Sequence, residues 1–152
     1  MRSVVFCTSQ RFRKELDEFV QKLKSAAEKN GAHVHVLTPN FEDDDQEIGK
    51  LPEKERLRDH MYRATVAGKV YDHLFRKVRV ADVCFIFNKD GYVGANTNGE
   101  LFAAAILGKT IYALEDKTLM GIYPHDLYEE PSSRKFIHDI VSSPEELLKR
   151  LH

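Results

Sequence analysis

Short apolar runs alternate along the chain with stretches whose apolar residues recur at helical spacing. The apolar runs have the length of strands, and polar turn residues bound them. They predict strands at residues 3–7, 33–37, 82–87 and 110–114, and a short fifth strand that includes Ile140 and Val141. The run over 82–87 is the most continuously apolar, so we expect it at the centre of a parallel sheet. The run over 33–37 alternates apolar and polar residues, which is typical of an edge strand.

Helices are predicted between these strands. The predicted helices cover residues 12–27, 53–80 with a break at Gly68, 99–107, and a last stretch that Ser143 caps and Pro144 opens. The stretch 99–107 is apolar nearly all round, which predicts a buried helix.

Strands that alternate with helices predict an α/β fold in which helices cover both faces of a parallel sheet. Right-handed crossovers favour a flavodoxin-like (Rossmann-like) three-layer sandwich with a roughly five-stranded sheet. A chain of 152 residues can bury a sizeable core, and we expect a single domain over residues 1–152.

The charge balance argues against a nucleic-acid polymer as the partner. Lys and Arg number 23 against 24 Asp and Glu, whereas binding to a phosphate backbone usually requires a basic excess. Cys7 and Cys84 both lie in apolar runs, so we expect buried free thiols in a reducing compartment. No apolar run is long enough to span a membrane and no signal sequence follows Met1. We therefore expect a cytoplasmic protein that has no membrane partner.

A carboxylate stands where the central strand gives way to the buried helix. Glu100 follows a small polar loop at the carboxyl end of strand 82–87, and ligands bind at such ends in open α/β sheets. The helix N-terminus favours negative charge, which predicts an ionised carboxylate that is available as a nucleophile. The same residue also fits a capping box with Thr97, in which the Glu side chain bonds back to the backbone. The local sequence leaves both roles open.

Several of these stretches resemble one family. A strand that begins Ala-Asp at 81–82 leads through a polar loop to Glu100, and Lys109 precedes the next strand. Near the N-terminus, Ser9 and Arg11 follow the first strand. This order of motifs resembles the nucleoside 2-deoxyribosyltransferase superfamily over nearly the whole chain, and in particular its 2′-deoxynucleoside 5′-phosphate N-hydrolase branch.

The resemblance implies a retaining glycosidase-type reaction on a small nucleoside or nucleoside 5′-monophosphate. In it, Glu100 attacks C1′ of a ribose or deoxyribose, the base leaves, and water or a second base completes hydrolysis or transfer. Asp72 or His73 is expected to assist Glu100 or the leaving base. The alternative for both residues is a surface pair on an amphipathic helix.

The other site candidates follow from the loops at the same edge of the sheet. Backbone donors at the start of the first helix suit a phosphate, which Arg11 could clamp, although Ser9 also fits as a simple helix cap. Tyr92 could stack on a base, while plain turn and cap roles are the alternatives for the second loop. The substrate-binding candidates are Cys7, Ser9, Gln10, Arg11, Asn88, Asp90, Tyr92, Gly94, Asn96 and Thr97.

Two departures from the family pattern leave a second function open. Phe102 stands where family members usually carry Gly, and Leu74 stands near the usual position of a supporting Asp. They favour the alternative of a non-catalytic nucleotide-binding or sensing module on the same fold.

We expect no cofactor, because no flavin-type phosphate loop is recognisable. His33 and His35 share one strand face, but no third ligand is evident, so we expect no metal. The resemblance implies a homodimer or a higher homo-oligomer. The irregular segment 117–133 is the candidate for contact with a neighbouring subunit.

Overall fold

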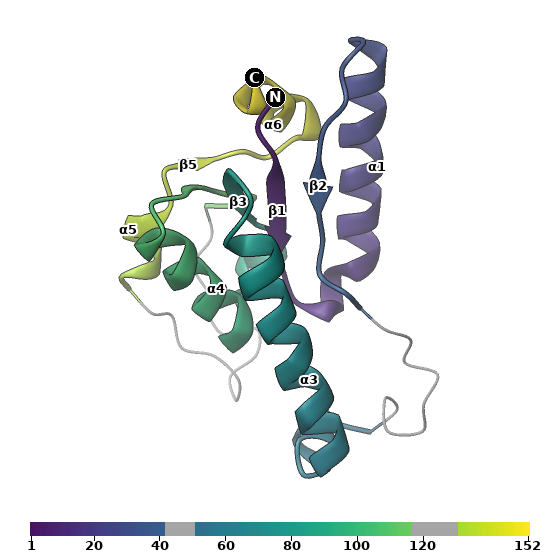
Figure 1. Ribbon diagram of the computed structural model, residues 1–152, viewed down its shortest axis with the longest axis vertical. Helices are drawn as coiled ribbons and strands as arrows, with labels where there is room; N and C mark the ends of the chain where they lie inside the picture. Colours follow the sequence, from purple (N-terminus) through teal and green to yellow (C-terminus); the bar gives the residue numbers. More distant parts are fainter. Residues whose placement is uncertain (42–50, 117–130) are drawn as a thin grey trace.

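The computed structural model describes residues 1–41, 51–116 and 131–152, which form an α/β structure around a five-stranded sheet (Figure 1). All the strand pairs are parallel and the strand order is β2-β1-β3-β4-β5. This order is that of flavodoxin-like folds, so the predicted fold class is confirmed. The strands are β1 (Val4–Cys7), β2 (Val36–Leu37), β3 (Val83–Ile86), β4 (Thr110–Ala113) and β5 (Asp139–Ile140).

The central strand β3 and its neighbour β1 are buried along their whole length. They pair in register from Val4 against Val83 to Cys7 against Ile86, and side chains on both of their faces enter the core. The predicted central strand is thus confirmed as β3. The outer strands β2 and β5 are only two residues long and half-buried, as expected for edges.

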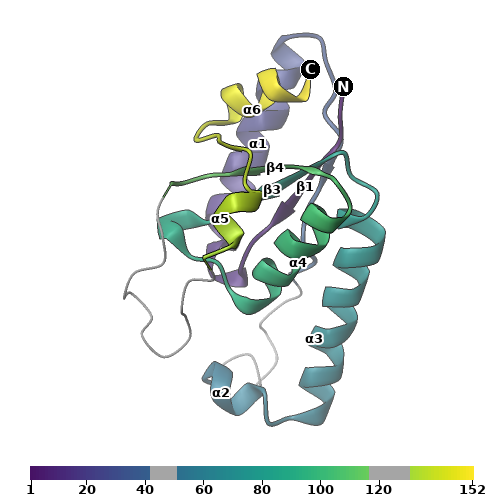
Figure 2. The same ribbon diagram turned by 90° about the vertical axis from the view of Figure 1, so that its left-hand side faces the viewer.

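Helices cover both faces of the sheet. On one face, α1 (Arg13–Lys29) and α6 (Pro144–Leu151) pack on a core that includes Phe6, Phe85 and Leu147. On the other face, α4 (Ala95–Ile106) and α5 (Ser133–Phe136) pack on a second core that includes Cys84. Figure 2 shows α4 on the near side of the sheet and α1 on the far side.

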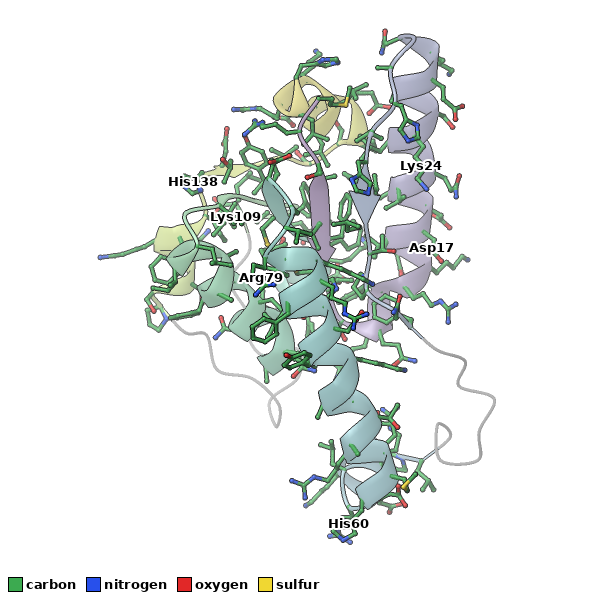
Figure 3. All side chains as sticks on the ribbon, in the orientation of Figure 1. Asp17, Lys24, His60, Arg79, Lys109 and His138 are labelled. Atoms are coloured by element: carbon green, nitrogen blue, oxygen red, sulfur yellow. The ribbon has the colours of Figure 1, made fainter. Side chains whose placement is uncertain are left out.

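The predicted position of the break in the helix over 53–80 is wrong. Gly68 lies inside a continuous helix, α3 (His60–His73), and the interruption comes earlier, after α2 (Glu53–Arg56). The Asp59 side chain accepts a hydrogen bond from the backbone N–H of Tyr62 at 2.7 Å, and this cap starts a new helix. A π-helical turn, η3 (Leu74–Val78), follows α3 directly. His60 lies at the end of α3 that is remote from the sheet (Figure 3).

The buried helix starts earlier than predicted. α4 begins at Ala95 rather than Gly99, with Gly94 in an extended conformation as its N-cap. It was also expected to be buried all round, but Ile106 is 89% exposed at its end. Among the described residues, no helix combines the length and the apolar character needed to cross a membrane. Most of the predicted loop over 39–51 and most of the irregular segment 117–133 lie outside the described residues.

Candidate functional site

Three buried polar side chains from three elements meet at the carboxyl end of β1. Cys7 is the last residue of β1, His73 the last of α3, and Glu100 lies in the second turn of α4. The Cys7 Sγ atom is 3.5 Å from His73 Nε2, and this nitrogen is 3.9 Å from Glu100 Oε2. One ligating atom from each side chain lies within 4.8 Å of the other two. The sequence separations are long, so only the packing of α3 and α4 on β1 creates this cluster.

Burial controls the charge of the cluster. It raises the pKa of Glu100 to about 7, and a hydrogen bond from Cys7 opposes that rise in part. Burial together with the Lys77 charge lowers the pKa of His73 to about 4, so the imidazole is neutral at pH 7. Burial and contact with Cys84 raise the pKa of the Cys7 thiol well above its ordinary value.

The position of Glu100 in its helix corrects two expectations. Because α4 starts at Ala95 and Gly94 is its N-cap, Thr97 is inside the helix and the predicted capping box does not form. Glu100 lies in the second turn, where the helix dipole favours an anion less than in the first. The carboxyl group is therefore partly protonated near pH 7, and the expectation of a fully ionised carboxylate is wrong there.

Asp72 and His73, which were expected to assist Glu100, have different surroundings although they are adjacent in the chain. His73 is 4% exposed and faces Cys7 and Glu100. Asp72 is partly exposed and forms an ion pair with Arg76 at 3.2 Å, one turn along the helix. The structure therefore brings His73, and not the Asp72 carboxylate, to the Glu100 side chain.

One ring nitrogen of His73 has no protein partner in the described part of the chain. Its Nδ1 atom is buried without a hydrogen bond, although the Phe6 backbone lies close enough to favour the protonated ring. The other ring nitrogen, Nε2, faces Cys7 and Glu100.

The predicted phosphate loop lies where β1 leads into α1. A short 3-10 turn, η1 (Gln10–Phe12), precedes α1, and the Ser9 hydroxyl accepts the backbone N–H of Arg11 at 3.3 Å. Gln10 and Arg11 are exposed. The guanidinium carbon of Arg11 lies 4.5 Å from the centre of the Tyr92 ring, so Tyr92 helps to position this cation.

The loop between β3 and α4 is fixed by contacts with the end of β4. The Asn88 amide donates to the Glu115 carbonyl at 2.8 Å and accepts the Glu115 N–H at 3.0 Å, while the Glu115 carboxylate accepts the Gly91 N–H. Asp90 is exposed and has a positive φ of 57°. Asn88 therefore holds two strand ends together, a role that its position at a turn did not indicate.

The remaining loop candidates divide by burial. Tyr92 is 8% exposed and packs edge-on against Phe12, whereas Asn96 is exposed. A Cβ atom at Gly94 would approach the Tyr92 ring to 3.3 Å, so the helix start and the ring are in close contact. Thr97 is 3% exposed inside α4.

Sequence reasoning missed two residues near the cluster. Cys84 Sγ lies 3.7 Å from Cys7 Sγ across neighbouring strands, and Lys77 adds a positive charge beside His73. The presence of both cysteines inside apolar runs was the only signal for the first. Phe102, where the resembled family usually has Gly, packs edge-on against Phe136 of α5 with ring centres 5.0 Å apart.

No family model matches the chain, and no curated protein matches its sequence. Its fold is found in solved structures. A conserved protein from Enterococcus faecalis V583 matches at 15% identity and TM-score 0.55, over 99% of this chain and 97% of that one. A 2-deoxyribosyltransferase from Bacillus psychrosaccharolyticus matches at 19% identity and TM-score 0.50, over 96% of this chain and 90% of that one. A CMP N-glycosidase from Clostridium botulinum matches at 15% identity and TM-score 0.44, over 98% of both chains.

We predict that Glu100→Gln stabilises the protein, and does so more at alkaline pH. The folded-state pKa of Glu100 is raised from 4.5 to about 7, so the ionisation cost of its burial is absent below about pH 4.5, grows as pH rises to about 7 and is constant above that. A neutral amide removes that cost, so the free energy of unfolding should exceed that of wild type by about 3 kcal/mol at pH 8. Urea denaturation at pH 5 and pH 8 measures the difference.

The exposed carboxylate of Glu18 on α1 provides the control. Glu18→Gln should change the free energy of unfolding little and equally at both pH values. His73 titrates in the wild type and in both variants, so its contribution cancels. A Glu100→Gln difference that is the same at pH 5 and pH 8 would show that the carboxyl group is not buried as described.

Proposed function

We propose that this chain is an N-glycosidase that cleaves or transfers the base of a nucleoside or nucleoside 5′-monophosphate, with Glu100 as the nucleophile. The observation that carries the proposal is the buried Glu100 carboxyl group beside an imidazole, at the carboxyl edge of a parallel sheet. Ligands bind at this edge in open α/β folds. The fold shared with a 2-deoxyribosyltransferase and the motifs around Glu100 support the same chemistry.

The proposed reaction proceeds in two displacements. A Glu100 oxygen forms a bond to C1′ while the C1′–N bond breaks, and the bonding electron pair leaves with the base, which takes up a proton. Water or a second base then attacks C1′ and releases the Glu100 carboxylate. Burial makes the carboxylate a poor resting anion, and the positive charge that develops on the sugar compensates for that cost in the transition state.

His73 is the positioning residue in this proposal. Its pKa of about 4 leaves it neutral at pH 7, which makes it a weak proton donor to the leaving base. Its Nε2 atom lies 3.9 Å from the Glu100 carboxylate, so the ring can instead limit the orientation of that carboxylate. Asp72, paired with Arg76, has only an indirect role through its negative charge next to His73.

The substrate phosphate is assigned to the loop after β1. Ser9, Gln10 and Arg11 lie at the start of the first helical segment, and Arg11 is exposed and held against Tyr92. A guanidinium in this position can bind a 5′-phosphate in bidentate fashion. Asn96 and Thr97, at the start of α4, are the candidates for contacts with the sugar.

Free-base release from ribo- and deoxyribonucleosides and their 5′-monophosphates tests this function directly. We expect release by the wild type, and a loss of at least about a thousandfold in kcat for Glu100→Ala. His73→Gln should lower kcat about a hundredfold by misplacing the carboxylate, whereas Asp72→Asn, its sequence neighbour, should have a smaller effect. Arg11→Met should raise KM for the 5′-monophosphates and leave the nucleosides unaffected.

The opposite result identifies the alternative function. If no substrate loses its base, with or without an acceptor base, yet calorimetry detects 5′-monophosphate binding, the chain is a nucleotide-binding module. Release that persists in Glu100→Ala would instead remove Glu100 as the nucleophile.

The pH dependence of kcat/KM should report the ionisation of Glu100. Only the ionised carboxylate can attack, and its pKa is raised to about 7, so activity should be lost as pH falls through about 7. Initial rates from pH 5 to pH 9 at subsaturating substrate measure this. A rate that increases as pH falls through this window would contradict the assignment, because it would require the protonated carboxyl group.

We further propose a homo-oligomer. Exposed apolar side chains on α3 and on the turn η3 that follows it support this proposal. Met61 is 77% exposed, Tyr71 62% and Phe75 42%. A second copy of the chain offers the same apolar side chains, and their burial would favour association. Light scattering coupled to gel filtration should give at least twice the 17.5 kDa of one chain. Met61→Lys together with Tyr71→Lys should reduce that mass, and a wild-type mass of one chain would contradict the proposal.

A further inference from the structure

The cluster of Cys7, His73 and Glu100 offers three different types of metal ligand at one point. A thiol sulfur, an imidazole nitrogen and a carboxylate oxygen all lie within 4.8 Å of one another, and all three residues are buried. Each comes from a different element, so the positions are set by the packed sheet and helices and not by a flexible loop.

We propose that Cys7, His73 and Glu100 form a binding site for a thiophilic divalent cation such as Zn²⁺. Zinc bonds of about 2.3 Å to sulfur and 2.0 Å to nitrogen, at a tetrahedral angle, put these two ligand atoms about 3.5 Å apart. The distance from Cys7 Sγ to His73 Nε2 is 3.5 Å. Glu100 Oε2 lies 3.9 Å from the same nitrogen, so a small rotation of the carboxylate completes the set. Three protein ligands leave a fourth position open for water.

The ligand types determine which cation fits. Thiolate and imidazole ligands favour zinc and similar transition metals, whereas Mg²⁺ and Ca²⁺ require mostly oxygen ligands. The thiol must lose its proton on binding, and with the Glu100 carboxylate it then supplies two negative charges against the two positive charges of the cation. A neutral centre results, which is the state that a buried site tolerates best.

The second nitrogen of His73 fits this role. When Nε2 binds a cation, the ring carries its proton on Nδ1, and ligating histidines usually donate that proton to a carbonyl or carboxylate. In the described residues Nδ1 makes no hydrogen bond, and the Phe6 backbone is close to the ring. A small movement of the ring gives this orphaned atom a partner.

Cys84 lies outside the ligand set. Its Sγ atom is 3.7 Å from Cys7 Sγ, but the three ligand atoms that lie within 4.8 Å of one another are those of Cys7, His73 and Glu100. Cys84 is therefore a matched control: it is a buried thiol on the neighbouring strand, beside the site and not in it.

The consequence for activity rests on the proposed function. A cation held by the Glu100 carboxylate occupies the oxygen that would attack C1′. Zinc should then inhibit base release, and a chelator should restore it. Binding of the cation itself does not depend on any catalytic activity.

Cobalt titration of the reduced, chelator-treated full chain tests the site, because Co²⁺ takes the place of zinc and is coloured. We expect one Co²⁺ per chain, with a thiolate-to-cobalt charge-transfer band and the intense visible bands of a four-coordinate ion. Adding Zn²⁺ should remove the charge-transfer band and the visible bands. Cys7→Ser should abolish the charge-transfer band. His73→Gln and Glu100→Gln should each weaken cobalt binding at least about tenfold.

The controls separate this site from other metal binding. Cys84→Ser should retain the band, and so should a double variant of the exposed His33 and His35. No charge-transfer band in the wild type, or a band that survives in Cys7→Ser or disappears in Cys84→Ser, would overturn the proposal. The wild-type and His73→Gln titrations decide the question even if Cys7→Ser does not fold. Cobalt binding without base release would refute the proposed function alone, and base release without cobalt binding would refute the metal site alone.

Discussion

The parallel pairing of β1 with β3 determines where every group of the site lies. These two strands are buried on both faces and pair along four residues, so their register is fixed by packing from both sides. Because the strands are parallel, the loops that follow them, toward Arg11 and toward Tyr92, leave from the same edge. The contact between the Arg11 guanidinium and the Tyr92 ring joins these loops, although they lie far apart in the chain.

Helix packing on this pair of strands then creates the electrostatic character of the site. α4 lies on β1 and β3 and carries Glu100 into a region with little water, which raises the pKa of Glu100 to about 7. The same burial keeps His73 neutral and holds the Cys7 thiol protonated. The cluster therefore contains two acids and one base that are close together but mostly uncharged. Strongly shifted pKa values of this kind are common at functional sites.

Both proposals rest on the same electrostatic property of the buried Glu100 carboxyl group. A buried carboxylate becomes favourable when a positive charge arrives next to it. A sugar with oxocarbenium character supplies that charge briefly at C1′, and a divalent cation supplies it durably. The thiol beside Glu100 distinguishes them, because a sugar has no need of sulfur whereas zinc and cobalt prefer it.

The sequence by itself determined the fold class and the central strand, and it singled out Glu100 as a candidate. Strands of a parallel sheet that helices cover on both faces are continuous apolar runs. The burial of β1 and β3 could therefore be predicted from their apolar runs alone. The tertiary structure decided the rest. Gly94 starts α4 before the expected position, and this moves Glu100 from a capping turn to the buried second turn. The tertiary structure also decided whether Asp72 or His73 lies next to Glu100. Adjacent residues of a helix point about 100° apart, and only the packing of α3 decides which of the two faces the sheet. The meeting of Cys7 with His73 and Glu100 is likewise a contact across three elements, which local sequence patterns cannot specify.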